Sequence, residues 1–145
     1  MAALASNKEF IFLCLSLTGL YFVVTGIQYW MPTYLKNVFL LTAEETTWFF
    51  TTTSISAPIF GVICGGLITT SFGGYNTVSA QRLQCYLGTM AVLCALPIPF
   101  CDTFRNFAIL IWFVLFFGGC VLPPLTGIML NCVPENKRIQ ANSIA

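Results

Sequence analysis

Four long runs without a charged residue divide this chain, and they constrain its fold more than any other feature. The runs extend over residues 10–35, 46–81, 83–101 and 106–134. A bilayer core about 30 Å thick is crossed by roughly 20 helical residues, so each run can supply one membrane span. Backbone groups cannot remain unpaired in lipid, which makes helices the expected structure. The sequence therefore predicts an all-α integral membrane protein with four transmembrane helices.

The spans can be placed approximately within these runs. We expect a single membrane domain over residues 1–145, with helices over about 10–32, 48–70, 83–100 and 107–131. The first run follows Lys8 but is longer than a typical signal-peptide core, so we expect it to be retained as a span. Because 57% of the residues are apolar and only 8% are charged, lipid is the expected solvent for much of the surface. Residues 132–145 are polar, and they predict a cytoplasmic loop followed by the start of a further helix.

Residues that commonly carry catalysis are sparse. The chain contains no His, which removes the commonest general base and the commonest metal ligand. None of its seven Cys residues forms a Cys-x-x-Cys pair. Glu44 and Glu45 are adjacent and so point to different faces of a helix. We therefore expect no enzymatic activity, no metal site and no cofactor. The net charge of +1 does not indicate a nucleic-acid partner.

Small residues recur at every fourth position of the second predicted span. They are Thr53, Ala57, Gly61, Gly65 and Thr69. This spacing places them on one helix face, and membrane helices use such faces to approach one another closely. The alternative is that small residues are simply common in membrane helices. We expect this face to be a packing surface.

Two other features concern the shape of the helices. Thr42 precedes Glu45 by three residues, which predicts a capping box at a helix starting near Ala43. The fourth span contains Pro123 and Pro124, which remove two backbone donors and predict a kink. Such a kink is either a static bend or part of a moving element.

Polar side chains share one face of the first span. Tyr21, Thr25 and Gln28 occupy positions i, i+4 and i+7. Polar groups within a membrane span favour a cavity or a neighbouring helix over lipid, so these residues are candidates to line a substrate cavity. Alternatively, Thr25 bonds its own helix backbone and Gln28 lies at the membrane interface. Thr126 in the fourth span is a further candidate.

The distribution of positive charges predicts the orientation in the membrane. One side of the predicted topology carries more Lys and Arg than the other. The richer side holds Lys8, Arg82, Lys137 and Arg138. Lys36 and Arg105 lie on the opposite side, together with three acidic residues. Both ends of the four-span unit are therefore expected in the cytoplasm.

The end of the second span resembles a known motif. The stretch from Gly65 and Gly66 through Thr70 and Ser71 to Gly73 resembles the loop signature of the major facilitator superfamily. In that signature a glycine pair is followed by an Asp-Arg pair and a further glycine. The spacing is kept here, but Thr70 and Ser71 occupy the Asp-Arg positions. Hydroxyl groups do not reproduce the charged contacts that this pair makes in the family.

Other segments are similar to the Spinster-like branch of that superfamily. Residues 25–34 look like the end of the seventh helix, residues 117–127 like the tenth helix, and residues 133–143 like the following loop. The resemblance implies a partial major-facilitator-type bundle comprising helices seven to ten of twelve.

This resemblance also implies a function. It indicates a fragment of a secondary active transporter that moves a small organic or lipid-like solute by alternating access. The implied location is a plasma or endolysosomal membrane. The implied partners are membrane lipid, the substrate, and either the remaining transporter helices or a second copy of the chain. Two alternatives stay open: a small four-helix structural subunit of a membrane complex, and a nonfunctional transporter remnant.

Overall fold

The chain folds into four long helices in a computed structural model that describes residues 8–75 and 78–131. The helices are α2 (Lys8–Val38), α3 (Ala43–Ser71), α4 (Val78–Ala95) and α5 (Phe104–Asn131), with a 3-10 turn η1 (Ile98–Phe100) after α4. All four are long and apolar enough to cross a membrane. The predicted all-α membrane fold with four spans is therefore confirmed. The loop and further helix predicted for residues 132–145 lie outside the described residues.

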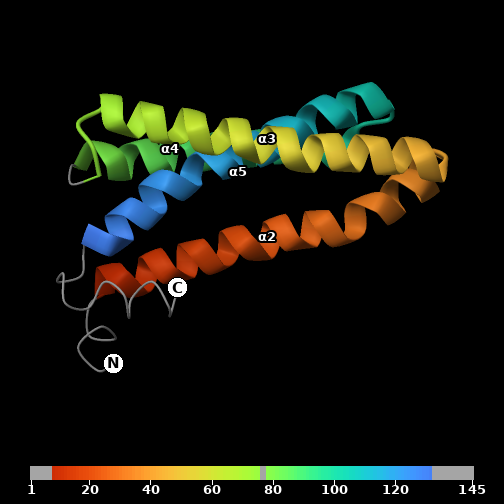
Figure 1. Ribbon diagram of the computed structural model, residues 1–145. Coiled ribbons are helices and arrows are strands. Elements are labelled where there is room, and N and C mark those ends of the chain that lie inside the picture. Colours follow the sequence, from red (N-terminus) through yellow and green to blue (C-terminus); the bar gives the residue numbers. More distant parts are fainter. Residues whose placement is uncertain (1–7, 76–77, 132–145) are drawn as a thin grey trace.

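Helix α5 is the centre of the arrangement, packed closely against α3 and α4 (Figure 1). Half of its most apolar stretch is buried, compared with 22% or less in each of the other helices. Each of the three clusters of buried side chains includes residues of α5. The protein core therefore follows α5 from one end to the other.

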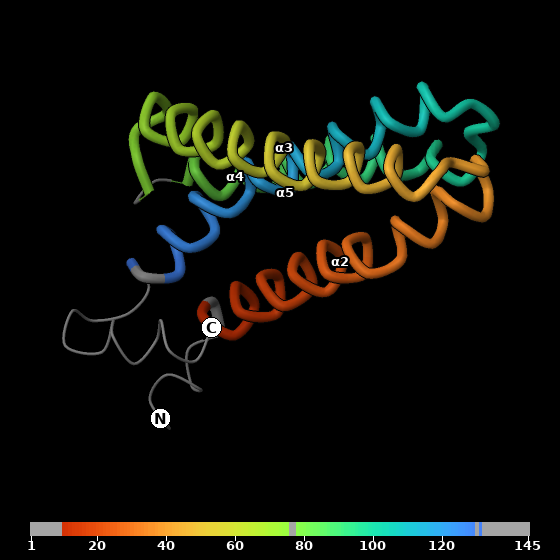
Figure 2. Tube along the Cα trace, turned by 45° about the vertical axis from the view of Figure 1, so that its right-hand side comes forward, coloured from red at the N-terminus to blue at the C-terminus, as the bar shows by residue number. Residues whose placement is uncertain are grey.

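Helix α2 contacts α5 at three levels. Near the end of α2, Met31 and Leu35 pack with Phe107 and Ile111. Leu17 belongs to the middle cluster. At the start of α2, Phe10 packs against Met129. Figure 2 shows α2 diverging from α3 towards its N-terminal end, where the last part of α5 bends towards it.

Two observed helices extend beyond the predicted spans, because neither Pro32 nor Arg82 ends a helix. Helix α2 continues through Pro32 to Val38. Proline lacks an N–H, which costs the carbonyl of Gln28 its helical partner but does not end the helix. Helix α4 begins at Val78 rather than residue 83 and so includes Arg82. A long cationic side chain near a helix end can reach water while its stem lies along apolar surface.

The third span ends at Phe100, as predicted, because the stretch that is apolar enough to cross a membrane runs over Val78–Phe100. Within it the regular helix stops at Ala95, and η1 follows. Pro97 and Pro99 explain this change, because each lacks the N–H that a continuing helix requires. Helix α3 ends at Ser71 and α4 begins at Val78, so the two helices lie closer together in sequence than the predicted spans do.

The predicted capping box at the start of α3 is confirmed. The Glu45 N–H donates to the Thr42 hydroxyl oxygen over 3.3 Å. The Glu45 carboxylate accepts from the Thr42 N–H over 2.9 Å and from its hydroxyl over 2.7 Å. These bonds supply partners for backbone donors at the first turn, where no intrahelical acceptor exists.

Candidate functional site

The small-residue face of α3 lies directly on α5. All five of its members are buried: Thr53, Ala57, Gly61, Gly65 and Thr69. A Cβ atom added to Gly65 would overlap the Cys120 carbonyl oxygen and lie 2.7 Å from the Cys120 Cα. A Cβ on Gly61 would overlap the Phe116 carbonyl oxygen. The two backbones therefore approach so closely that no side chain fits between them.

The contact is reciprocal, because α5 also contributes a glycine. A Cβ added to Gly119 would lie 2.8 Å from the Pro58 carbonyl oxygen and 3.2 Å from the Gly61 Cα. Further along the same pair of helices, the Trp112 indole N–H donates to the Ser56 hydroxyl over 3.1 Å. Glycine contacts and one polar bond thus fix the register of α3 on α5.

The loop signature is mostly helical. Gly65, Gly66, Thr70 and Ser71 belong to α3, and the helix ends at Ser71. The Thr70 hydroxyl donates to the Gly66 carbonyl over 2.8 Å, and the Ser71 hydroxyl donates to the Leu67 carbonyl over 2.9 Å. Both residues are exposed. The two hydroxyls at the Asp-Arg positions therefore bond their own helix.

The turn after α3 places Tyr75 on α5. Gly73 and Gly74 adopt positive φ angles of 98° and 78°, a conformation that glycine enters without a Cβ penalty. A Cβ added to Gly127 would lie 2.7 Å from Cγ of the Tyr75 ring and 2.9 Å from its Cε1. The aromatic ring therefore rests on a glycine in the last part of α5. This contact joins the α3–α4 turn to a helix distant in sequence.

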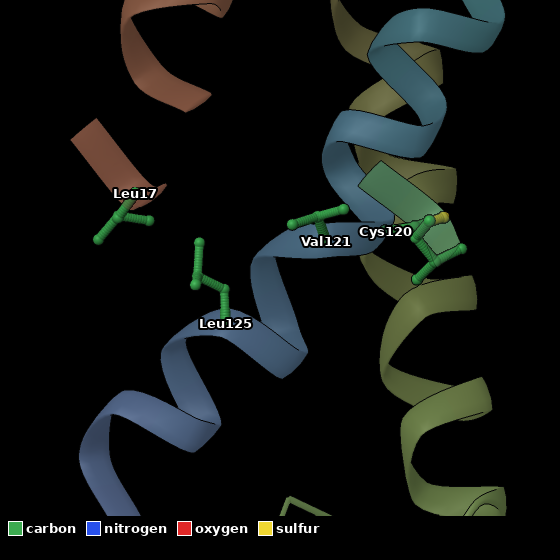
Figure 3. Close-up of a cluster of buried hydrophobic side chains, with 5 residues drawn as sticks. Leu17, Cys120, Val121 and Leu125 are labelled. Carbon is green, nitrogen blue, oxygen red and sulfur yellow. The ribbon is translucent and has the colours of Figure 1, made fainter. Parts of the chain in front are cut away.

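Helix α5 changes direction beside its two prolines. Figure 3 shows the bend between Cys120 and Leu125, with Leu17 of α2 opposite Leu125. Pro123 and Pro124 lie inside the helix and provide no N–H for the carbonyls of Gly119 and Cys120. The bend carries the end of α5 away from α3 and towards α2 (Figure 1).

The four candidate substrate residues lie in two different environments. Tyr21, Thr25 and Gln28 are exposed on α2. Thr126 is half-buried, and its hydroxyl donates to the carbonyls of Leu122 over 2.9 Å and Pro123 over 3.2 Å. The Thr126 hydroxyl thus bonds the bent segment of its own helix, whereas the three α2 residues are exposed.

A cavity of about 520 Å³ lies between α2, α4 and α5. Its wall is almost entirely apolar, and the polar side chains at its edge are Ser16 and Gln84. None of the four candidate substrate residues contributes to it. The sequence contained a usable signal, since Gln84, Gly88, Ala91 and Ala95 recur at helical spacing on α4. The spacing marks one face of α4, but it does not show that α2 and α5 leave space opposite that face.

The described residues contain no group of three or more His, Cys, Asp and Glu side chains that could hold a metal ion. The cysteines in the described ranges are free thiols. The chemistry that these helices offer is therefore close packing, an apolar cavity and an exposed polar face.

Comparison with known proteins gives one match. The model of the Organic Anion Transporter Polypeptide (OATP) family matches residues 1–106. No curated protein and no solved structure matches the chain. The matched residues contain α2, α3, α4 and the first three residues of α5.

Proposed function

The chain belongs to the Organic Anion Transporter Polypeptide family, and on that premise we propose that its helices form part of a secondary transporter. The family match is the observation that carries this proposal, since it covers three of the four spans completely. The proposed cargo is a small amphipathic or lipid-like organic anion. The proposed mechanism is alternating access, in which two groups of helices rock about a substrate site near the midplane.

The exposed polar face of α2 supports a role in the substrate path. Tyr21, Thr25 and Gln28 share one face of a membrane span, and all three are exposed. Lipid does not hydrogen-bond these groups, so a polar face within a span favours a water-filled path or another helix. We propose that this face meets the substrate path between these four helices and the remaining transporter helices, or a second copy of the chain.

The packing of the helices supports a rocking motion. Helices α3 and α4 each pack closely against α5, whereas α2 contacts α3 and α5 less extensively. Closely packed helices move as a unit. We therefore propose that α3, α4 and α5 form one body, against which α2 and its external partners adjust.

The orientation is part of the same proposal. Arg82 lies near the start of α4, whereas Lys36 and Arg105 lie at the opposite ends of the spans. The positive-inside tendency favours a cytoplasmic position for the Arg82 side, in a plasma or endolysosomal membrane. A glycosylation acceptor inserted between α2 and α3 should become modified, while one inserted between α3 and α4 should not.

Uptake of a fluorescent organic anion tests the proposed function. Cells expressing the full chain should accumulate 5-carboxyfluorescein faster than cells without it. Thr25→Val and Gln28→Ala should lower uptake on the order of fivefold, because each removes a hydrogen-bonding group from the substrate path.

Thr89→Val is the matched control. Thr89 is also an exposed threonine, but it lies on α4, and its hydroxyl already donates to the Cys85 carbonyl over 2.8 Å. This variant should leave uptake unchanged. Correct membrane insertion without uptake of any tested anion would instead indicate a structural subunit. Equal effects of Thr89→Val and Thr25→Val would contradict the assigned face.

A further inference from the structure

The cavity between α2, α4 and α5 is wide because its glycines have no helix packed against them. A Cβ atom added to Gly19 or Gly88 would meet no atom within 4 Å, and one on Gly118 would meet only Leu20 Cδ1 at 3.9 Å. Gly61 and Gly65 show the opposite behaviour, since added Cβ atoms there would overlap the backbone of α5. The glycines around the cavity therefore leave space that the described helices do not use.

The chemistry of the wall restricts what can fill this space. The Ser16 hydroxyl already donates to the Phe12 carbonyl over 2.9 Å. Gln84 is half-buried, and its side chain makes no hydrogen bond within the described part of the chain. All other side chains at the wall are apolar. A suitable occupant is thus a long apolar chain with a polar group near Gln84.

The dimensions match one membrane leaflet. The cavity follows α4 from Gln84 to Ala95, which at 1.5 Å per residue spans about 17 Å. Half of a bilayer core about 30 Å thick is about 15 Å, the depth reached by one acyl chain. The three surrounding helices all qualify as membrane spans. The cavity therefore lies at the depth at which lipid chains are the available apolar material.

The polar end of the cavity restricts the rest of the occupant. A Gln side chain carries N–H groups that can donate to a carbonyl oxygen. Each acyl chain of a phospholipid begins at an ester carbonyl of this kind. Gln84 is the polar residue of α4 at the cavity wall. We propose that the cavity holds one acyl chain of a membrane phospholipid, with its ester group near Gln84. This assignment is independent of transport.

Photolabelling tests the assignment. The purified full chain is reconstituted in vesicles of phosphatidylcholine that contain a phosphatidylcholine analogue with a diazirine in the middle of one acyl chain. Mass spectrometry of the irradiated protein should find label on the cavity side of α4, at Gly88 and Ala91, in excess over the opposite side. Uniform labelling around α4, or the absence of label at these positions, would overturn the proposal.

Filling the cavity provides a matched comparison. Gly88→Leu should lower cavity labelling on the order of fivefold, because the leucine side chain would occupy the space of the acyl chain. The surrounding helices are closely packed and leave the acyl chain no other space beside residue 88. Thr89→Leu places the same side chain one residue away, at an exposed position outside the cavity wall, and should leave labelling unchanged. Equal labelling of the Gly88 and Thr89 variants would sink the proposal.

Two further measurements keep the outcomes separate. Thermal unfolding shows whether Gly88→Leu still folds, and we expect an unchanged or higher midpoint because leucine favours helix more than glycine does. If the variant fails to fold, the labelling pattern of the unmodified chain still decides. Excess 5-carboxyfluorescein should not displace the label. Displacement would assign the cavity to the transported anion and overturn the lipid assignment.

Discussion

Gly65 of α3 lies so close to Cys120 of α5 that an added Cβ atom would stand 2.7 Å from the Cys120 Cα. The next residue, Gly66, has no atom within 4 Å of an added Cβ. Two adjacent glycines of one helix thus differ completely in their surroundings. The first is required by the contact between helices, whereas the second is not.

This difference predicts opposite effects of the same substitution. Gly65→Ala should destabilise the protein by about 1–3 kcal/mol, because overpacking forces the backbones apart. Gly66→Ala should be neutral or stabilising by up to about 1 kcal/mol, because it only improves helix propensity. Reversible unfolding in mixed detergent measures both. Equal effects of the two variants would show that α3 and α5 do not meet at Gly65.

The bond between Trp112 and Ser56 should contribute measurably to the same contact. Ser56→Ala leaves the indole N–H without its acceptor and should cost about 0.5–1.5 kcal/mol of unfolding free energy. Trp112→Phe removes the donor as well as ring area. In a double-mutant cycle, the two changes together should cost less than their sum. Strict additivity would mean that the bond does not contribute to stability.

The Tyr75–Gly127 contact predicts a change in the turn after α3. Gly127→Ala should displace the Tyr75 ring, because the added methyl would lie 2.7 Å from its Cγ. Chymotrypsin should then cleave after Tyr75 faster than in the unmodified protein. Gly118→Ala is the control, since its added methyl meets only Leu20 Cδ1 at 3.9 Å. Unchanged cleavage of the Gly127 variant would contradict the contact.

The capping box predicts a local effect at the start of α3. Thr42→Ala removes a cap and should cost about 1 kcal/mol. Amide hydrogen exchange in the first turn of α3 should become faster as a result. Thr47→Ala is a suitable comparison, because the Thr47 hydroxyl donates to the Ala43 carbonyl of its own helix over 2.8 Å. If Thr47→Ala has the larger effect on exchange, the cap is not the stabilising feature.

Local features of the fold were predictable from sequence, but the helices that pack against them were not. The four-residue spacing from Thr53 to Thr69 was sufficient to identify the buried face of α3, because a helix repeats its faces at that spacing. The cap at Thr42 depends only on residues within one turn. Neither pattern contains information about which helix lies opposite, so the central position of α5 could not be derived.

The candidate site was less predictable for the same reason. Polarity identified Tyr21, Thr25 and Gln28 as a group, but their exposure depends on where α5 crosses α2. The cavity requires three helices to be placed relative to one another. The contact of Tyr75 with Gly127 joins a turn to a helix that is distant in sequence, and neither residue type indicates this contact. Helix ends at Val38 and Val78 were missed because Pro32 and Arg82 permit a helix as well as a boundary.

The prolines of α5 affect its contact with the glycine residues of α3. Pro124 leaves the Cys120 carbonyl without a helical donor, and that oxygen faces the position where Gly65 carries a hydrogen instead of a side chain. A Cα–H···O bond there is worth roughly 0.5–1 kcal/mol. An alanine at position 124 would restore the backbone N–H that bonds the Cys120 carbonyl in a regular helix. Any side chain at position 65 would push that carbonyl away from the Cα–H of residue 65. The two positions are thus expected to covary among relatives, although they lie on different helices and serve different geometrical purposes.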